Sequence, residues 1–366
     1  MKVAIVHDWL NQKGGAEGVL ETLVAMFPEA PVFTTIYWRD GMPDHYRAWD
    51  IRTTWLDRAP FIYRHHQPYL PVYPLAIQSM DLRGYDLILS NKSGFCHGVR
   101  TGPGQLHIDY CLTPTRYVWD YAGYAAREGL GPLARLALKP LIRRLQDWDR
   151  RAAAGVHHFI AISHEIRERI ARFYARDSTI IYPPVNTDRY RPCSDRPGDY
   201  FLVVSRLIPY KRIDLAVRAC SALGLPLIVG GEGRDRAALE AIAGPTVRFI
   251  GRVPDDQLGD LLAHCWAFIF PGCEDFGITP VEAQAAGRPV IAYAAGGALD
   301  TIVDGETGLF FYEQTPEALT DAIRRLDAME FDPAAMRRNA ERFSADRFKR
   351  ELRAFVEEKW REFTEN

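Results

Sequence analysis

The sequence predicts an α/β protein made of two successive parallel sheets with helices on both faces. Short runs of Val, Ile, Leu and Phe alternate with helical patterns along all 366 residues. The runs are almost continuously apolar, as expected of strands that are covered on both faces of a parallel sheet. A Pro183-Pro184 pair divides the runs into two groups, and the chain is too long for one ordinary core.

The first group predicts one α/β unit. Its expected strands are residues 2–6, 87–90, 107–110 and 158–162, and its expected helices are residues 16–26, 140–154 and 163–173. The first apolar run ends at His7 and Asp8, so it indicates a buried strand and not a secretory leader. No run approaches the roughly 20 apolar residues of a membrane span. We therefore expect a cytoplasmic protein, attached at most peripherally to the inner face of the plasma membrane.

The proline pair predicts the domain boundary, because it removes two backbone donors and favours extended geometry in the residue before it. Strands then follow at 201–205, 227–229, 247–250, 267–270 and 289–293, with helices at 212–223, 234–243, 255–264 and 280–286. We expect domains at residues 1–183 and 184–344. The remaining segment, 345–366, is expected to be a helix that packs back toward the N-terminal domain.

The composition excludes several classes of protein. A net charge of −2 argues against a general nucleic-acid binder, which needs an excess of Lys and Arg. The six cysteines form no Cys-x-x-Cys pair, which argues against a structural zinc or a redox dithiol.

Two cations follow the first strand of the second domain, in the segment SRLIPYK. Ligands of open α/β sheets bind beyond the carboxyl ends of the strands. Arg206 and Lys211 stand at such an end, where they could converge on one diphosphate.

A second motif, PGCEDFGITPVEA, joins the run 267–270 to the next helix. With Thr279 as N-cap and Pro280 in the first turn, the amides of Gly277, Ile278 and Thr279 would form a phosphate site. Glu282 would lie in the first turn near a ribose, and Glu274 at the mouth of the loop near a sugar.

A double glycine, Gly14-Gly15, follows the first strand and precedes a helix. It lets the backbone approach a bulky ligand closely. It does not match Gly-x-Gly-x-x-Gly, so a dinucleotide site is not indicated.

Taken in this order, the three elements resemble the retaining glycosyltransferase family 4, over nearly the whole chain. The resemblance implies the GT-B fold, in which two Rossmann-like α/β/α domains face each other across a cleft. It implies that Arg206 and Lys211 hold the donor diphosphate, that Glu282 binds the ribose and that Glu274 approaches the donor sugar. It also places Val253 at the base and Phe276 among the donor contacts.

The segments HDWLNQKGGAE and YCLTPTRYVWDY resemble bacterial mannosyltransferases of polysaccharide assembly, which use GDP-mannose. The implied acceptor is a glycan or a polyprenol-linked sugar, with Arg116 and Tyr117 on the acceptor side. Such relatives often carry a histidine where this chain has Leu112, which leaves a dedicated base in question. His97 is a catalytic candidate, and His107 is a further polar candidate.

Retention of the anomeric configuration without a protein nucleophile implies that the acceptor attacks from the face from which the diphosphate leaves. The resemblance implies no cofactor and no divalent metal. Four alternatives remain: a UDP- or dTDP-sugar donor, a nucleotide-sugar 2-epimerase, a non-catalytic sugar-nucleotide binder, and a pyridoxal-phosphate phosphorylase.

Two stretches do not fit the sheet pattern. Residues 63–75 are rich in aromatics and proline, and residues 127–151 are basic among leucines, with Arg135, Lys139, Arg143, Arg144, Arg150 and Arg151. They predict either a loop with a solvated helix or a surface for an anionic or lipid-linked acceptor.

Overall fold

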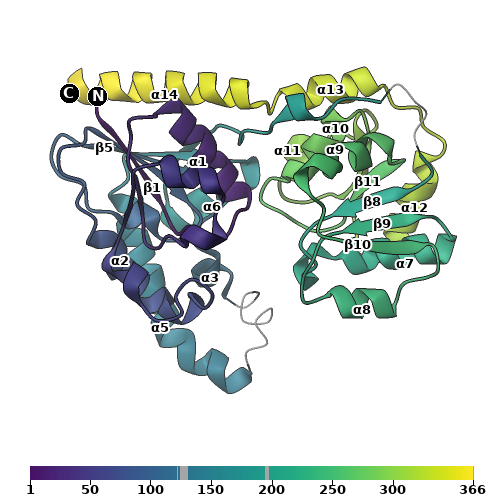
Figure 1. Ribbon diagram of the computed structural model, residues 1–366, viewed down its shortest axis with the longest axis horizontal. Coiled ribbons are helices and arrows are strands. Elements are labelled where there is room, and N and C mark those ends of the chain that lie inside the picture. The colour runs from purple at the N-terminus through teal and green to yellow at the C-terminus, as the bar shows by residue number, and fades with distance from the viewer. Residues whose placement is uncertain (122, 124–130, 194–197, 366) are drawn as a thin grey trace. The chain divides into compact units, whose positions relative to one another are not determined.

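The computed structural model describes residues 1–121, 123, 131–193 and 198–365. They form two compact units (Figure 1). Unit 1 contains residues 1–184 and 348–366, and unit 2 contains residues 185–347.

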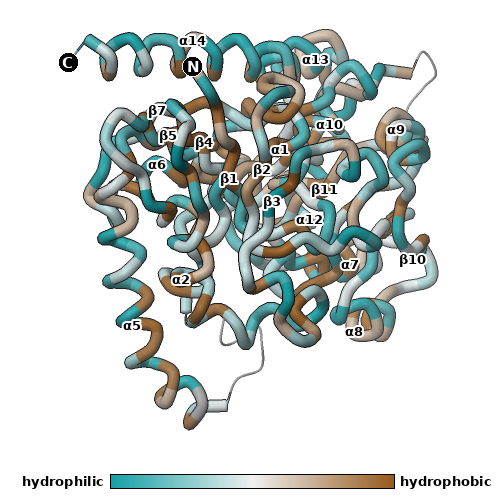
Figure 2. Tube along the Cα trace, turned by 60° about the vertical axis from the view of Figure 1, so that its left-hand side comes forward, coloured by the Kyte–Doolittle hydropathy of each residue, from teal (hydrophilic) through white to brown (hydrophobic). Residues whose placement is uncertain are grey.

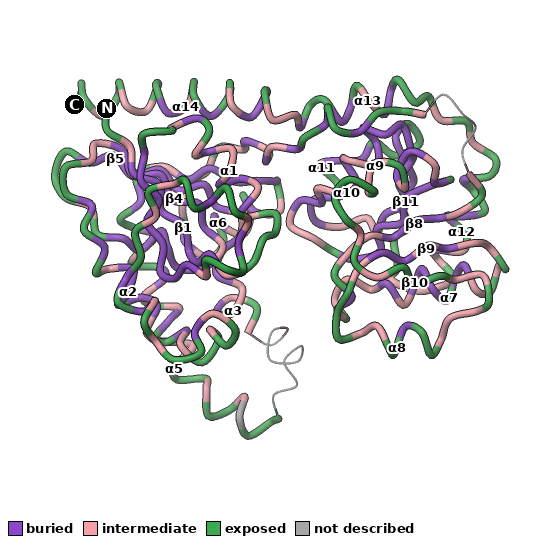
Figure 3. Tube along the Cα trace, in the orientation of Figure 1, coloured by how far each residue is buried: buried purple, intermediate pink, exposed green. Residues whose placement is uncertain are grey.

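Unit 1 is built on a seven-stranded parallel sheet in the order β3-β2-β1-β4-β5-β6-β7. Its strands are β1 (Val3–His7), β2 (Val32–Thr34), β3 (Ile51–Thr53), β4 (Leu87–Lys92), β5 (Leu106–Cys111), β6 (His158–Ala161) and β7 (Ser178–Ile180). The central strands β1 and β4 are buried (Figure 3). Their continuous apolar runs are the signal from which they were predicted, whereas β2, β3 and β7 were not predicted.

The helices of unit 1 are α1 (Gly15–Met26), α2 (Tyr73–Gln78), α3 (Arg116–Trp119), α5 (Pro132–Ala154), α6 (His164–Tyr174) and α14 (Ala345–Glu365), whose first three residues belong to unit 2. Helix α6 begins where the Ser163 hydroxyl accepts from the N–H of Ile166, and it ends at Ala175, which has a positive φ of 52°. Phe348 of α14 lies edge-on to Tyr110 of β5, with 5.5 Å between the ring centroids.

Short 3₁₀ turns connect these elements: Arg39–Gly41, Asp44–Ala48, Trp55–Arg58, Gln67–Val72 and Cys96–Gly98 in unit 1, and Thr187–Arg189 and Pro209–Lys211 in unit 2. The stretch 63–75 therefore contains a 3₁₀ turn that leads into α2. Helix α5 begins at Pro132, earlier than expected, and includes Pro140 in its interior. Residues 127–130 of the basic stretch lie outside the described residues.

Unit 2 is built on a six-stranded parallel sheet in the order β10-β9-β8-β11-β12-β13. Its strands are β8 (Phe201–Val204), β9 (Leu227–Gly230), β10 (Val247–Gly251), β11 (Ala267–Phe270), β12 (Val290–Tyr293) and β13 (Gly308–Phe311). Its helices are α7 (Ile213–Leu223), α8 (Arg236–Ala241), α9 (Asp255–His264), α10 (Ile278–Ala285), α11 (Ala298–Thr301), α12 (Pro316–Leu326) and α13 (Pro333–Glu341).

Helices cover both faces of this second sheet. Helices α7, α8 and α12 lie on one face, and α9, α10, α11 and α13 lie on the other (Figure 1). The larger apolar core lies between the sheet and the pair α7 and α12. The prediction of two successive α/β units with parallel sheets is thus confirmed.

Candidate functional site

The strand order of unit 2 reverses between β8 and β11, which are hydrogen-bonded neighbours. Such a reversal opens a crevice at the carboxyl ends of the strands, where α/β proteins bind ligands. Arg206 follows β8 and Glu274 follows β11, so both lie at this edge.

Lys211 and Glu274 form an ion pair at this edge, with side-chain exposures of 11% and 23%. Lys211 lies in the 3₁₀ turn that precedes α7, and its Nζ is 5.4 Å from the ring centroid of Tyr210. Arg206 Nη2 donates to the hydroxyl of the same Tyr210 at 3.2 Å. The structure therefore brings together the two predicted cations and the predicted glutamate.

The loop that carries Glu274 lies on a second pair of glycines, Gly296-Gly297. The N–H of Gly297 donates to the carbonyl of Glu274 at 2.8 Å. A Cβ on Gly296 would collide with that carbonyl, and a Cβ on Gly297 would collide with the backbone of Phe276. These glycines fix the loop. They were not predicted as site residues, although a double glycine after a strand was a usable signal.

Helix α10 begins at Ile278 with Gly277 as its N-cap, so the prediction of Thr279 as N-cap is wrong. Gly277 has a φ of +93°, and a Cβ there would lie 3.1 Å from the Phe270 ring. The chain can therefore turn into the helix two residues earlier than expected. The N–H groups of Ile278 and Thr279 belong to the first turn, where helix amides have no intrahelical acceptor and favour an anion.

Phe276 was predicted among the donor contacts. Its ring is 4% exposed and lies 5.5 Å from the Phe343 ring, in the interior of unit 2. This position leaves the backbone of Phe276, and not its ring, for a ligand.

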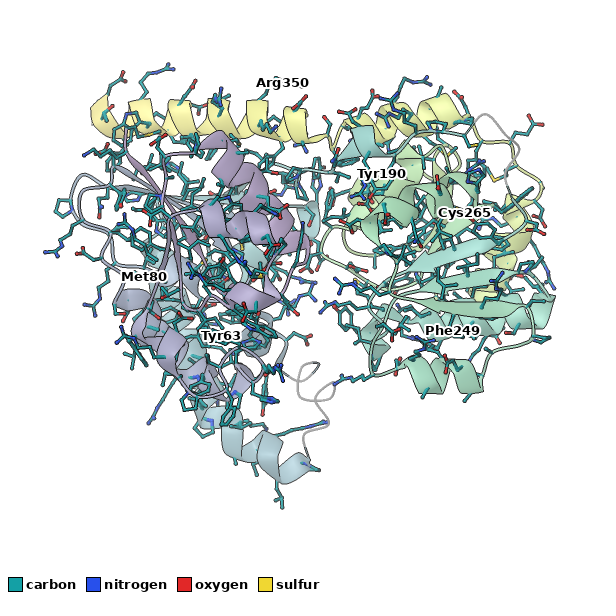
Figure 4. The ribbon with its side chains drawn as sticks, viewed as in Figure 1. Tyr63, Met80, Tyr190, Phe249, Cys265 and Arg350 are labelled. Carbon is teal, nitrogen blue, oxygen red and sulfur yellow. The ribbon has the colours of Figure 1, made fainter. Side chains whose placement is uncertain are left out.

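Glu282 lies in the second turn of α10 and not in the first as predicted, because the helix begins at Ile278. Its Oε1 accepts a hydrogen bond of 2.9 Å from Tyr190 Oη. Tyr190, labelled in Figure 4, is 3% exposed. Its loop is held by Arg337, whose Nη1 donates to the carbonyls of Tyr190 and, at 2.7 Å, of Thr187. Burial raises the pKa of Glu282 to about 7 and also raises the pKa of Tyr190. Sequence reasoning missed Tyr190, which belongs to no motif.

Val253 follows β10, and its side chain lies over the end of β9. A Cβ on Gly230 would be 2.5 Å from Val253 Cγ2, so the glycine makes room for the valine. The N–H of Gly231 donates to the carbonyl of Gly251 at 2.6 Å and ties the ends of the two strands together. The predicted base contact thus lies at the same edge of the sheet as Arg206.

In unit 1, Gly14 is the N-cap of α1 and Gly15 is its first residue. Glu17 Oε2 accepts from the N–H of Gly14 at 2.7 Å, and Glu17 Oε1 lies 3.3 Å from His7 Nε2. His7 Nδ1 is in turn 3.2 Å from the amide of Asn91. The buried Glu17 therefore holds the double-glycine loop in place.

A second buried carboxylate, Asp8, organises the same edge of the sheet. Its two oxygens accept from four successive backbone N–H groups, those of Ser93, Gly94, Phe95 and Cys96, at 2.6–2.7 Å. The side chain has no solvent exposure. Asp8 fixes the loop after β4, a role that the sequence pattern did not indicate.

His97 was predicted as a catalytic candidate, but the structure places it in the interior of unit 1. Its side chain has no exposure, and its Nε2 lies 3.3 Å from the carbonyl and 3.5 Å from the carboxylate of Asp149. Burial, with the charge of Lys92, holds the pKa of His97 well below its usual range. In this position the neutral imidazole is enclosed within unit 1, which does not favour the predicted catalytic role of His97.

His107 is also buried. Its Nε2 lies 2.9 Å from Ser90 Oγ, and burial lowers its pKa to about 3. It remains neutral and belongs to the core of unit 1.

Arg116 and Tyr117, the predicted acceptor-side residues, begin α3 and are half-buried. The Tyr117 ring is 6.2 Å from the ring of Trp9, which follows β1. They therefore lie at the same sheet edge as the double glycine. Leu112 is half-buried nearby, and its N–H donates to the carbonyl of Lys92.

The part of the chain that the structure describes contains no group of three or more His, Cys, Asp or Glu side chains suited to a metal ion. None of its helices is both long enough and apolar enough to cross a bilayer.

Comparison with known proteins identifies the family. The Glycosyltransferase Family 4 description matches residues 13–189, and Glycosyl transferases group 1 matches residues 188–343. The chain is 29% identical, over 279 residues, to a D-inositol 3-phosphate glycosyltransferase of Streptomyces avermitilis, covering 66% of this chain and 57% of the relative. It is also 29% identical to a GDP-mannose-dependent alpha-(1-6)-phosphatidylinositol monomannoside mannosyltransferase of Mycolicibacterium smegmatis, covering 60% of this chain and 63% of the relative.

The matched region thus spans less than two thirds of the length of either curated relative. Among solved structures, sucrose-phosphate synthase of Thermosynechococcus elongatus superposes with a TM-score of 0.73 at 20% identity, over 98% of this chain and 99% of that one. This likeness shows the fold, and the two family matches together span residues 13–343. The chain belongs to glycosyltransferase family 4 and has the GT-B fold.

Proposed function

We propose that the chain is a retaining glycosyltransferase that moves a sugar from a nucleotide-sugar donor onto an acceptor hydroxyl. The observation that carries this proposal is the grouping of Arg206, Lys211 and Glu274 at the edge of the unit 2 sheet, where the strand order reverses. Two cations around one tyrosine suit a diphosphate, and a carboxylate beside them suits the hydroxyls of a sugar.

The chemistry follows from where charge develops. As the bond from the anomeric carbon to the diphosphate breaks, negative charge accumulates on the leaving phosphate. Arg206, Lys211 and the first amides of α10 are positioned in advance around that charge, which lowers the barrier. The leaving phosphate takes the proton of the acceptor hydroxyl, which attacks from the same face. The sugar keeps its anomeric configuration, and no separate base is needed in place of Leu112.

We propose a hexose as the donor sugar, with GDP-mannose as the first candidate. Support comes from the segment HDWLNQKGGAE and from the mannosyltransferase name of one relative. A UDP- or dTDP-sugar is the alternative donor, because backbone contacts near Val253 carry little information about the base. The proposed acceptor is a glycan or a polyprenol-linked sugar.

We also propose that unit 1 meets the cytoplasmic face of the plasma membrane through the N-terminal end of α5. Leu133 and Leu136 are 84% and 61% exposed there, and the exposed Lys139 and Arg143 follow them. Figure 2 shows hydrophobic residues in these first turns. Apolar side chains beside cations favour an anionic lipid surface.

The test is a thermal-shift panel of GDP, UDP, ADP and dTDP, followed by incubation with the sugar derivative of the nucleotide that stabilises most. Stabilisation by one nucleotide and release of that nucleotide from its sugar derivative support the proposal. Proton NMR of the product then shows whether the anomeric configuration is retained. If a nucleotide sugar is instead isomerised without release of nucleotide, the 2-epimerase alternative is correct. If no nucleotide stabilises the protein, the assignment of Arg206, Lys211 and Glu282 to donor binding is wrong.

A further inference from the structure

Unit 1 contains a hollow of about 450 Å³ beside strands β2 and β3, a volume in the range of small-molecule sites. Five aromatic residues line it: Tyr37, Trp38, Tyr46, Trp49 and Tyr63. The family descriptions assign it no role, and of its lining residues only Tyr63 belongs to a stretch considered above. Tyr63 is labelled in Figure 4.

The rings form two pairs. Trp38 and Tyr63 are nearly parallel, with 6.2 Å between centroids and an angle of 7°. Tyr46 and Trp49 are 4.0 Å apart and inclined by 34°. Trp38, Trp49 and Tyr63 are half-buried, so part of each side chain stays accessible at the hollow, although the Trp38 ring lies against Gly41 and 5.6 Å from the Arg64 guanidinium. Flat aromatic surface suits the apolar C–H faces of a sugar ring.

The charges around the hollow indicate a neutral ligand. Two arginines, Arg39 and Arg47, and two aspartates, Asp40 and Asp57, line it, so the formal charges cancel. Such a set donates and accepts hydrogen bonds equally well. It favours a neutral polyhydroxylated molecule over a phosphate or an amine.

The hollow is tied to the loop that carries the double glycine. The N–H of Trp38 donates to the carbonyl of Leu10 at 2.8 Å, and the Asn11 side chain donates to the carbonyl of Tyr63 at 3.0 Å. Residues 10 and 11 lie between β1 and Gly14. A ligand in the hollow would therefore lie against the segment that leads into α1.

From these observations we infer that the hollow binds a neutral sugar unit of the acceptor glycan, one other than the unit that receives the transferred sugar. Only the description of the ligand as part of the acceptor rests on the proposed function. The recognition of a sugar rests on the aromatic pairs and the balanced charges alone.

The experiment uses the full chain labelled with 5-fluorotryptophan and observed by ¹⁹F NMR. The chain has eight tryptophans, and Trp38→Phe, Trp49→Phe and Trp55→Phe assign the three signals of interest. Methyl α-mannoside, methyl α-glucoside and methyl α-galactoside are titrated in turn, with glycerol as the non-sugar polyol. Trp55 is the matched control, because it is 52% exposed, near in sequence and outside the hollow.

We expect at least one glycoside to shift the Trp38 and Trp49 signals saturably, with the Trp55 signal and the glycerol titration unchanged. Trp38→Ala should weaken binding by at least about tenfold, as truncation of a central aromatic contact does. Trp38→Phe, which keeps a ring, should retain most of the affinity, and Trp55→Ala should retain all of it.

The inference is overturned if no glycoside shifts Trp38 or Trp49, if Trp55 shifts in parallel, or if Trp38→Ala binds as tightly as the unmodified chain. Donor turnover is measured separately. A chain that binds glycosides in the hollow but turns over no nucleotide sugar contradicts the proposed function and leaves the sugar site in place.

Discussion

The hydroxyl of Tyr190 donates a hydrogen bond of 2.9 Å to the carboxylate of Glu282, 92 positions away in the chain. Burial raises the pKa of this carboxyl to about 7. If Glu282 binds the ribose as proposed, above that pH the ionised carboxylate accepts hydrogen bonds from the ribose hydroxyls as well as from Tyr190. Below it, the protonated carboxyl offers fewer acceptor sites. Affinity for the nucleotide sugar should therefore fall as the pH drops through about 7, by up to about tenfold per unit.

Isothermal titration calorimetry with the nucleotide sugar at a series of pH values measures this effect. The free nucleoside diphosphate is unsuitable, because a terminal phosphate itself titrates near pH ~6. Glu282→Gln should bind weakly and without the pH dependence. Tyr190→Phe removes a hydrogen bond that lowers the pKa of Glu282, so its transition should move to higher pH. An unchanged pH profile in Glu282→Gln would show that another group titrates.

Arg206 and Lys211 should be separable from ordinary surface cations by their effect on kcat. If both stabilise charge on the leaving phosphate, Arg206→Ala and Lys211→Ala should each lower kcat by about 10²–10³. Steady-state kinetics of nucleotide release measures this loss. Arg324→Ala is the control, because this arginine of α12 has a side chain that is 66% exposed. Full activity and unchanged donor affinity in both variants would show that Arg206 and Lys211 do not hold the donor diphosphate.

The residues of unit 2 that sequence reasoning identified share one property. Arg206, Glu274 and Glu282 lie in segments that follow buried strands, so the local sequence pattern also indicates that they lie at the edge of the sheet. Tyr190 and Gly296 come to the same place from distant parts of the chain. Nothing in their local sequence indicates which residues they contact, and only the fold reveals it.

Elements were missed in both units, β13 and α11 to α13 in unit 2 among them, and those missed in unit 1 have physical reasons. Strands β3 and β7 have three residues each, none fully buried, so they lack the apolar run that marks a central strand. The first turns of α5 were not predicted because Pro140 lies inside this helix, and an interior proline usually breaks a helix. A single histidine such as His97 has no local signal that distinguishes an enclosed ring from a catalytic one.

Asp8 should be among the residues on which the stability of unit 1 depends most. Its carboxylate satisfies four backbone N–H groups, whereas an asparagine has a single acceptor oxygen. Asp8→Asn leaves at least two buried donors unpaired, at about 1–3 kcal/mol each. We expect the unfolding free energy of unit 1 to fall by about 3 kcal/mol or more.

Guanidinium chloride denaturation followed by tryptophan fluorescence measures this change. Seven of the eight tryptophans belong to unit 1, and Trp266 is the exception, so the signal reports mainly on that unit. Asp44→Asn, at a side chain that is 90% exposed, should stay within about 0.5 kcal/mol of the unmodified chain. Equal midpoints for Asp8→Asn and Asp44→Asn would refute the structural role of Asp8.

The N-terminal end of α5 should bind vesicles that contain phosphatidylglycerol and not vesicles of phosphatidylcholine alone. Leu133, Leu136, Lys139 and Arg143 recur at intervals of three or four residues, so they share one side of the helix. Charge reversal in Lys139→Glu/Arg143→Glu should weaken partition by at least about 2 kcal/mol, since each cation near such a surface contributes about 1 kcal/mol.

Co-sedimentation at low and high salt separates the two contributions to vesicle binding. The electrostatic part should decline as salt shortens the screening length, whereas the loss in Leu133→Asp/Leu136→Asp should persist at high salt. Arg350→Glu is the matched control, because Arg350 is an exposed arginine on a different helix, α14 (Figure 4). If Arg350→Glu weakens the binding of the chain to vesicles as much as charge reversal in α5 does, the attraction depends on the net charge of the chain and not on this helix end. If both α5 variants bind like the unmodified chain, this helix end does not contact lipid.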